Sequence, residues 1–338
     1  MQVSTTKDTK EHEGNPATQR LVSLADIREA QSRIRGITVR TKLIPLQHNG
    51  RTLYLKPENQ QPVGAFKLRG AYNKIASLTE QERARGVITY SSGNHAQGVA
   101  YAARALKTKA VIVMPRNAPK IKLDATAVLG AEIVLVGPSG VERQIKAEEL
   151  AAEHGYVIVP PYDDEKIIAG QGTTGAEIVE DLPDVDLVLV PIGGGGLISG
   201  VATAIKSLRP DAKVIGVEPE LGADAQASLR AGHVVKFPAE QVLSTIADGL
   251  RAQFVGTLTF EHIRRYVDDV VTVSEDEIMQ AVRILAADQQ TVAEPSGAVA
   301  SAAWLFHPES LPGSKNTVSI ISGGNIDPAL LNKVRQTA

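Results

Sequence analysis

The stretch PVGAFKLRGA, residues 62–71, places Lys67 among small residues and beside one aromatic side chain, just ahead of an amphipathic helix. Most lysines lie on the surface, where water solvates the ammonium group. A lysine among apolar neighbours loses part of that stabilisation, so its pKa falls and the free amine becomes a nucleophile. We interpret Lys67 as a candidate Schiff-base lysine. The alternative is a solvated lysine that opens a helix.

The composition is that of an ordinary globular protein. The chain has 338 residues, of which 43% are hydrophobic and 22% charged, enough for a large core in one or two domains. The formal net charge is -2 with both signs interspersed, which argues against binding to nucleic acid or a membrane surface. The absence of cysteine excludes disulfides, a thiolate nucleophile and a zinc-thiolate site. We expect small molecules or copies of the chain as partners.

The first residues show no targeting signal. Residues 1–20 are rich in Lys, Glu and Thr and lack the apolar core of a signal peptide, so they predict a flexible tail. No later apolar run approaches the roughly 20 residues that a membrane helix needs. The expectation is a soluble, cytoplasmic protein.

Beyond the tail, strand and helix patterns alternate. Val/Ile-rich runs such as 110–114 and 186–192 are separated by helical segments, a pattern typical of parallel sheets covered on both faces. Residues 86–163 predict a small domain, and residues 21–85 and 164–338 a larger one. The predicted fold class is α/β, with two doubly wound, mostly parallel sheets. The small domain would be inserted in the larger one, which leaves a cleft between them at the strand ends, where such folds bind their ligands.

A glycine run lies between a buried strand and a helix. It comprises Gly193, Gly194, Gly195 and Gly196. Its bare amides and the helix N-terminus can face a phosphate, although the spacing matches neither a dinucleotide fingerprint nor a P-loop. Glu218 ends the next strand about 20 residues on, where an acid could bind ribose. A nicotinamide oxidoreductase therefore stays open as an alternative of a different class.

A second possible anion site follows the strand at residues 87–90. The run Ser91, Ser92, Gly93, Asn94 and His95 opens a helix, so its amides could hold a carboxylate while its side chains offer two hydroxyls and an amide. The alternative is an ordinary N-cap with a turn glycine.

Together these motifs resemble the pyridoxal-phosphate enzymes of the tryptophan-synthase-β fold (fold type II), in the serine/threonine dehydratase and serine racemase family. The resemblance covers nearly the whole chain after the tail. Its motifs, in order, are FKLRGA (66–71), SSGNH (91–95), GGGG (193–196), TIADG (245–249), EPSG (294–297) and SGGN (322–325). Ala65 and Tyr90 depart from the family pattern, in which a serine and a smaller residue or histidine are usual.

The resemblance assigns roles to individual residues. Lys67 would form the Schiff base and remove the α-proton, and Ser92 would face it from the other side of the ring. The implied cofactor-binding residues are Phe66, Lys67, Asn94, Gly193, Gly194, Gly195, Gly196, Gly249, Glu294 and Ser322. The implied substrate-binding residues are Ser91, Ser92, Gly93, Asn94, His95 and Arg143.

The implied reaction is β-elimination of water and ammonia from an L-β-hydroxy amino acid, which gives a 2-oxo acid. Serine or threonine is the default substrate, and 3-hydroxyaspartate or a bulkier 3-hydroxy amino acid are open options. Ser322 opposite the ring nitrogen cannot balance a pyridinium charge, which favours prompt loss of the β-leaving group. An amino-acid racemase that uses Ser92 is the alternative enzyme, and a non-catalytic cofactor-binding module is the alternative outside catalysis.

A metal site is also predicted. Glu218 and Asp224, with the Gly222 carbonyl between them, could hold a hard cation, and the racemase branch has a Mg, Ca or Mn site with this spacing. Isolated acid pairs are more often solvated surface. The family further implies a homodimer.

Overall fold

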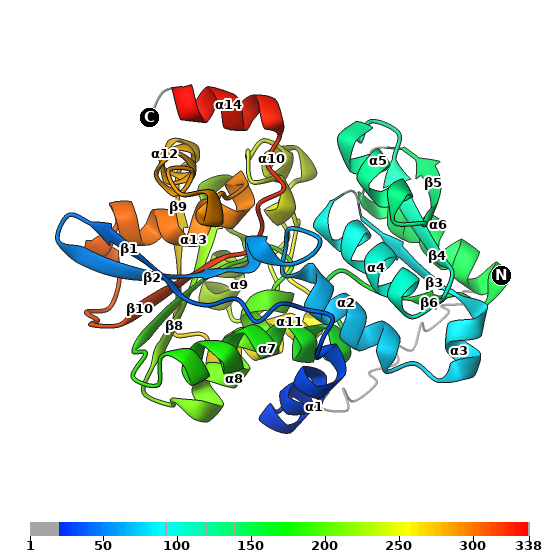
Figure 1. Ribbon diagram of the computed structural model, residues 1–338, viewed down its shortest axis with the longest axis horizontal. Coiled ribbons are helices and arrows are strands. Elements are labelled where there is room, and N and C mark those ends of the chain that lie inside the picture. The colour runs from blue at the N-terminus through cyan, green and yellow to red at the C-terminus, as the bar shows by residue number, and fades with distance from the viewer. Residues whose placement is uncertain (1–19, 92, 119, 138–139, 337–338) are drawn as a thin grey trace, which may run out of the picture.

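The protein folds around two β-sheets, shown in Figure 1 in a computed structural model that describes residues 20–91, 93–118, 120–137 and 140–336. The six-stranded sheet has the order β1-β2-β10-β7-β8-β9 and the four-stranded sheet the order β5-β4-β3-β6. The strands are β1 (Ile44–His48), β2 (Arg51–Pro57), β3 (Val87–Tyr90), β4 (Ala110–Pro115), β5 (Glu132–Val136), β6 (Val157–Ile158), β7 (Leu187–Pro191), β8 (Lys213–Pro219), β9 (Asp269–Val273) and β10 (Thr317–Ile321).

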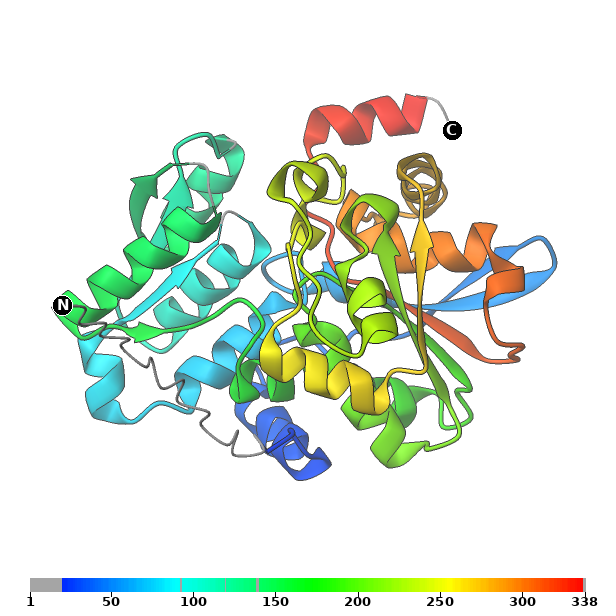
Figure 2. The ribbon, with the colours of Figure 1, turned by 180° about the vertical axis from the view of Figure 1, so that it is seen from behind.

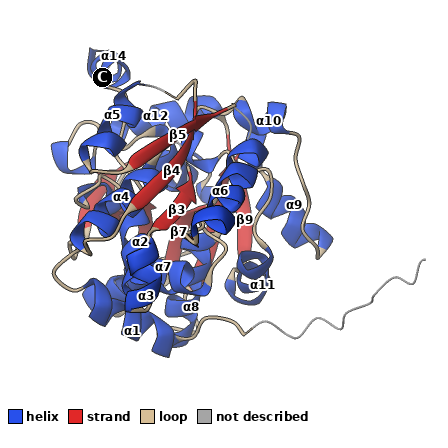
Figure 3. Cartoon of the chain, turned by 90° about the vertical axis from the view of Figure 1, so that its right-hand side faces the viewer, coloured by secondary structure: helices blue, strands red, loops and turns tan. Residues whose placement is uncertain are grey.

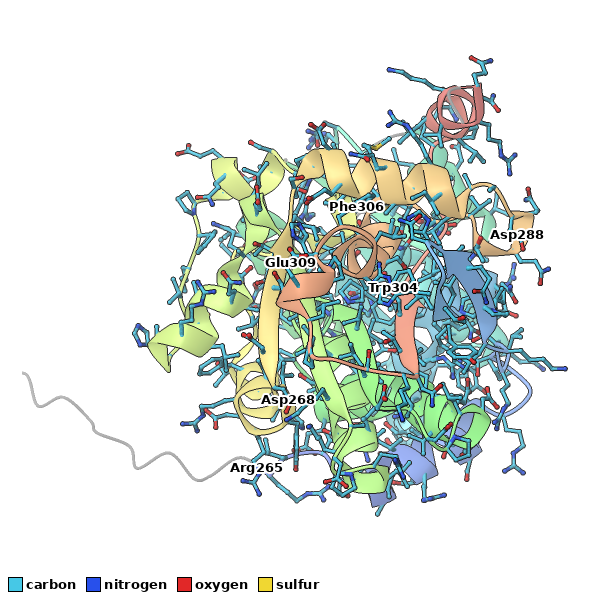
Figure 4. The ribbon with its side chains drawn as sticks, turned by 90° about the vertical axis from the view of Figure 1, so that its left-hand side faces the viewer. Arg265, Asp268, Asp288, Trp304, Phe306 and Glu309 are labelled. Carbon is cyan, nitrogen blue, oxygen red and sulfur yellow. The ribbon has the colours of Figure 1, made fainter. Side chains whose placement is uncertain are left out.

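The larger sheet is parallel except for β1, which pairs antiparallel with β2. Alternate side chains of its strands enter two different cores, as the period of two in a strand requires. Leu187, Leu189 and Ile215 pack toward α12 (Glu275–Leu285) and α13 (Pro295–Phe306). In Figure 4, α13, with Trp304 and Phe306 labelled, lies directly under α12.

The opposite face of this sheet is covered by α7 (Glu165–Asp181), α8 (Gly196–Leu208) and α11 (Thr257–Tyr266). Val188, Val190 and Val214 point to that side. Figure 2, seen from behind, shows α11 in yellow on this face. A sheet covered on both faces explains why its strands read as unbroken apolar runs.

The smaller sheet is entirely parallel. Figure 3 shows its strands between α4 (Asn94–Ala105) and α6 (Gly140–His154). Ile112 and Met114 pack toward α4, whereas Val111 and Val113 pack toward α6. The α2 helix (Lys67–Ala76) contributes Leu68 to the same core as α4, and it also packs against α7, so it lies where the two halves of the molecule meet.

The remaining α-helices in the described part of the chain lie around the two sheets and their covering helices. They are α1 (Leu24–Ile34), α3 (Glu80–Arg85), α5 (Lys120–Val128), α9 (Asp224–Ala231), α10 (Ala239–Leu243) and α14 (Pro328–Gln336). Ser23 caps α1 in a reciprocal capping box with Asp26, which satisfies the free amides at a helix start. None of the helices in the described ranges is long and apolar enough to cross a membrane.

The predicted α/β class with two mostly parallel sheets is confirmed. The α7 helix contains several glycines that serve close helix packing: a Cβ on Gly170 would lie 2.6 Å from the Gly70 Cα atom. The six-stranded sheet is mostly parallel, as predicted, and its single antiparallel pair is the hairpin of β1 with β2.

Candidate active site

A cavity between the two sheets gathers the predicted site residues. The lining includes every predicted cofactor and substrate residue that the structure describes: Phe66, Lys67, Ser91, Gly93, Asn94, His95, Arg143, Gly193, Gly194, Gly195, Gly196, Gly249, Glu294 and Ser322. Ser92 lies outside the described residues. Gly193 follows β7 and Ser322 follows β10, and these strands are neighbours. The cavity therefore opens at the carboxyl ends of parallel strands, where such sheets bind ligands.

Lys67 is the first residue of α2, and its Nζ donates a hydrogen bond to the Pro161 carbonyl at 2.7 Å. Burial lowers the pKa of Lys67 to about 8, because a low-dielectric setting disfavours the ammonium. The α4 helix approaches closely, since a Cβ on Gly98 would lie 3.2 Å from the Lys67 carbonyl carbon. Lys67 thus presents its amine to the cavity from a tightly packed helix.

The glycine run has no room for side chains. A Cβ on Gly194 would lie 2.1 Å from the Tyr162 ring, and one on Gly195, whose φ is +91°, would lie 2.9 Å from Thr259. The run ends at Gly196, the first residue of α8. Bare backbone amides and a helix N-terminus thus line this end of the cavity, an arrangement that favours an anion.

A second helix N-terminus lines the opposite wall, since α4 begins at Asn94. His95 is buried, and its Nε2 contacts the Val159 carbonyl at 3.0 Å. Burial and the charge of Lys67 lower the pKa of His95 to about 3, so the ring is neutral at physiological pH. Its Nδ1 has no hydrogen-bond partner among the residues that the structure describes.

The third wall combines Ser322, Ser296 and Glu294. The Ser322 hydroxyl donates to the Ser296 carbonyl at 3.4 Å, and the Ser296 hydroxyl accepts from the Gly249 amide at 2.8 Å. Glu294 accepts a 2.5 Å hydrogen bond from Asn94 Nδ2. Burial raises the pKa of Glu294 to about 7, and the nearby Asp248 carboxylate adds to this effect.

Several lining residues were not predicted from the sequence. Tyr162 packs against Gly194 and Gly196 of the glycine run, and burial raises its pKa. Lys122 of α5 forms an ion pair with Asp248 in the 3-10 turn η3 (Asp248–Leu250) and so links the two halves across the cavity. Asp248 stands inside the TIADG motif, which could have revealed it. Tyr162 and Lys122 lie outside all the sequence motifs, so no local pattern predicted them.

The outer part of the cavity holds Arg143, on α6, and Tyr90, at the end of β3. Burial lowers the pKa of Arg143 and raises that of Tyr90. A guanidinium in such a place can bind a carboxylate in bidentate fashion.

The predicted metal residues lie outside this cavity lining. Glu218 accepts hydrogen bonds from the amides of Ala225 (2.9 Å) and Gln226 (2.8 Å), and it does not line the cavity that contains the glycine run, where the nicotinamide alternative would need it. Both Asp224 carboxylate oxygens are buried without a hydrogen-bond donor in the described part of the chain. Burial raises the pKa of Asp224 to about 7. Burial and the Asp224 charge raise the pKa of Glu218.

These carboxylates do not form a complete metal-binding cluster on their own. The described ranges hold no group of three or more His, Cys, Asp or Glu side chains that could bind a metal ion. A cation here would need further oxygen ligands such as the Gly222 carbonyl and water.

Comparisons with known proteins agree with the geometry. Residues 34–323 match the family model described as "Pyridoxal-phosphate dependent enzyme". The chain is 46% identical over 318 residues to an "L-threonine ammonia-lyase" of Thermotoga maritima, covering 93% of this chain and 78% of that protein. It is 43% identical over 306 residues to an "L-threo-3-hydroxyaspartate ammonia-lyase" of Saccharomyces cerevisiae, covering 89% and 93%. The fold also matches maize serine racemase, with a TM-score of 0.89, 37% identity and coverage of 94% and 98%.

The residues present fit pyridoxal phosphate. Side chains do not fit in the glycine run, so only its backbone amides could contact a phosphate. Burial lowers the pKa of the Lys67 amine, which favours Schiff-base formation. The resemblance to the serine/threonine dehydratase and serine racemase family is confirmed.

Proposed function

This chain belongs to the pyridoxal-phosphate dependent enzymes, and we propose that it is an ammonia-lyase that converts an L-β-hydroxy amino acid to a 2-oxo acid and ammonia. The observation that carries the proposal is the partly buried Lys67, whose amine has a lowered pKa, between two helix N-termini in one cavity. When bound, the cofactor withdraws electrons from the substrate's α-carbon. The names of the two ammonia-lyases above support the same class of reaction.

Lys67 would hold the cofactor through Nζ, and its amine would serve as the base for the α-proton of the substrate. Its lowered pKa of about 8 leaves a larger fraction of neutral amine than an exposed lysine has, which suits a general base near neutral pH. The Pro161 carbonyl, 2.7 Å from Nζ, orients the amine without adding a negative charge that would raise its pKa.

The two helix N-termini divide the anionic groups between them. The amides of Gly193 to Gly196 would bind the phosphate, and those at the start of α4 would bind the substrate carboxylate. Ser322 would serve the ring nitrogen, and its neutral hydroxyl would not hold a pyridinium proton as a carboxylate would. This weaker electron sink favours loss of the β-hydroxyl over transamination.

The substrate side chain would extend toward Arg143 and Tyr90. Serine and threonine are the default substrates, and a second carboxylate, as in 3-hydroxyaspartate, could pair with Arg143. The test is a panel of L- and D-serine, threonine, hydroxyaspartate and phenylserine assayed for 2-oxo acid. Borohydride should also trap the cofactor on Lys67. A trapped chromophore with no turnover of any substrate would instead indicate a binding module.

Racemisation is a second candidate activity, supported by the similarity to maize serine racemase. It needs a proton donor on the face opposite Lys67, and Ser92 would have that role. Replacing Ser92 by Ala should abolish racemisation and spare elimination of the L-substrate. Racemisation that persists in this variant would exclude Ser92 as the donor.

We extend the proposal to a divalent cation at Glu218, Gly222 and Asp224, where the buried Asp224 carboxylate oxygens make no hydrogen bond of good geometry within the described residues. The substrate panel should be run with and without chelator to test it.

A cytoplasmic homodimer, with a small domain at residues 86–163 inserted between residues 21–85 and 164–338, is part of the same proposal. Light scattering, cell fractionation and limited proteolysis would test these features.

A further inference from the structure

The loop ahead of Lys67 is joined to the SGGN motif at residues 322–325. Ala65 and Gly323 form an antiparallel bridge. Two backbone hydrogen bonds flank it: Phe66 N to Ser322 O at 3.1 Å and Gly324 N to Gly64 O at 2.9 Å. The last residue of the motif, Asn325, is therefore held beside the lysine loop.

Asn325 connects this loop to Asn94 and Glu294. Its Nδ2 donates to the Val63 carbonyl at 2.9 Å and to the Asn94 Oδ1 at 2.8 Å. The Asn94 Nδ2 in turn donates to the Glu294 Oε1 at 2.5 Å. We call Asn325, Asn94 and Glu294 the amide clamp.

The Val63 carbonyl at one end and the Glu294 carboxylate at the other determine how the two asparagine amides are oriented. A backbone carbonyl can only accept, so Asn325 must turn its NH₂ group toward Val63 and has its second N–H left for Asn94. Asn94 then presents its oxygen to Asn325 and its nitrogen to Glu294. One N–H of Asn94 is left over, and Asn94 lines the cavity.

Two glycines make space for the clamp. A Cβ on Gly323 would lie 2.3 Å from Glu294 Oε1 and 3.0 Å from Asn94 Nδ2. A Cβ on Gly64 would lie 2.3 Å from Asn325 Oδ1. The packing around these side chains leaves little freedom for the Asn94 amide to rotate.

The clamp also spans the two halves of the molecule. Asn94 begins α4, which packs on the four-stranded sheet, whereas Glu294 caps α13 and Asn325 follows β10 on the six-stranded sheet. The Asn94 amide is thus oriented by groups from the other sheet, and only while the two halves are together.

We propose that Asn325 and Glu294 are positioning residues that hold the Asn94 amide in one orientation, so that its remaining N–H is available to the phenolic oxygen of the bound cofactor ring, the contact that the family resemblance implies for Asn94. The inference rests on the proposed cofactor site. A donor fixed in advance stabilises negative charge on that oxygen without reorganisation. Asn325 acts through Asn94 and does not itself reach the cofactor.

The test compares the wild type with Asn325→Asp, loaded with pyridoxal phosphate and without substrate. Aspartate has nearly the shape of asparagine but cannot donate to Val63 or Asn94. We expect a cofactor dissociation constant about tenfold higher, the loss of one good hydrogen bond. The visible band should also shift to shorter wavelength, because an oxygen without its donor retains a proton. Measurements without substrate keep this test separate from that of the proposed reaction.

Asn59→Asp is the matched control. Asn59 packs against Gly324 in the same region, and its Nδ2 donates to the Gln290 and Val292 carbonyls, each at 3.0 Å. The same chemical change is made there outside the cavity lining. The band should stay in place and the dissociation constant should change less than twofold. An equal effect from both variants would overturn the proposal in favour of general loop packing.

Glu294 tests the clamp from its other end, and it does so even if Asn325→Asp fails to fold. Glu294→Gln can still present a carbonyl to Asn94 and should keep the wild-type band. Glu294→Ala cannot, and should shift the band as Asn325→Asp does. A wild-type band and affinity in Glu294→Ala would contradict the clamp.

Discussion

Two groups of buried carboxylates differ in how their charge is balanced. In the first, Arg69 donates to Glu58 and to Glu177, each at 2.7 Å, and Lys56 also donates to Glu177 at 2.7 Å. In the second, Glu218 and Asp224 form no ion pair in the described part of the chain, and the Asp224 carboxylate makes no hydrogen bond of good geometry there, although the Val255 amide lies near it. We call the first the arginine network and the second the acidic pair.

The electrostatics separate the two groups. In the arginine network, burial alone would raise the pKa of Glu177, but the charges of Arg69 and Lys56 outweigh burial and lower it. In the acidic pair, burial raises the pKa of both carboxyls. A buried charge is tolerated when it is paired. The arginine network is therefore complete as it stands, whereas the acidic pair fits a site that takes up a cation or protons.

The largest effect should follow from Arg69→Met. Glu58 and Glu177 would stay buried, with Lys56 alone to balance them. Breaking a buried network in this way costs about 3–5 kcal/mol. Urea unfolding of the apoprotein, followed by circular dichroism, should show a free energy of unfolding that is lower by this amount, or the variant should fail to fold.

The double variant Arg69→Met/Glu58→Gln supplies the control. It removes one positive and one negative charge, so Lys56 and Glu177 are left as a balanced pair. It should recover a large part of the lost stability. If the double variant were as unstable as the single one, packing of the guanidinium would matter more than charge balance.

The lining of the cavity could be predicted from the sequence because much of that lining consists of local motifs. Lys67, the glycine run and residues 91–95 each need only a few adjacent residues to be recognised, and all of them line the cavity where described. The acidic pair was likewise found from the short spacing between Glu218 and Asp224.

The arginine network could not be predicted in the same way. Arg69 and Glu177 are 108 residues apart, and each lies on a helix where a charged residue usually faces water. The amide clamp was missed for a similar reason, since Asn94 and Asn325 are 231 residues apart. Such contacts depend on how the two sheets pack, which no local pattern encodes.

The acidic pair should make stability depend on pH and on divalent cations. The folded pKa of Asp224 is raised from 3.8 to about 7, so the folded state binds more protons than the unfolded state between these values. Stability from this pair is therefore full below about pH 4 and is lost as the pH rises through 7. The loss should be a few kcal/mol.

Millimolar Mg²⁺ should offset that loss at pH 8, because the cation binds the ionised carboxylates. We expect the melting temperature to rise by several degrees at pH 8 and hardly at all at pH 5. Asp224→Asn should abolish the Mg²⁺ response, whereas the control Asp211→Asn, at an exposed position, should leave the response unchanged. A response to Mg²⁺ that persists in Asp224→Asn would place the cation elsewhere.

Within the arginine network, a neutral partner should matter less than a charged one. The Thr41 hydroxyl donates to Glu58 Oε1 at 3.0 Å, and both side chains are buried. Thr41→Val removes that donor while the carboxylate stays, which should cost about 1.5–3 kcal/mol. Thr52→Val, which removes an exposed hydroxyl bonded to Gln47, should cost far less in the same urea titration.

The smallest effect should come from Arg40, which repeats the chemistry of Arg69 at the surface. Its guanidinium pairs with Glu180 and Asp181, each at 2.5 Å, but its side chain is 51% exposed. Water and salt screen such pairs, so Arg40→Gln should cost less than about 1 kcal/mol, and less still in 1 M salt. Urea titrations at low and high salt would measure this. A cost near that of Arg69→Met would show that the number of ion pairs matters more than their burial. The expected small cost would instead show that the arginine network stabilises the fold because it is buried away from water.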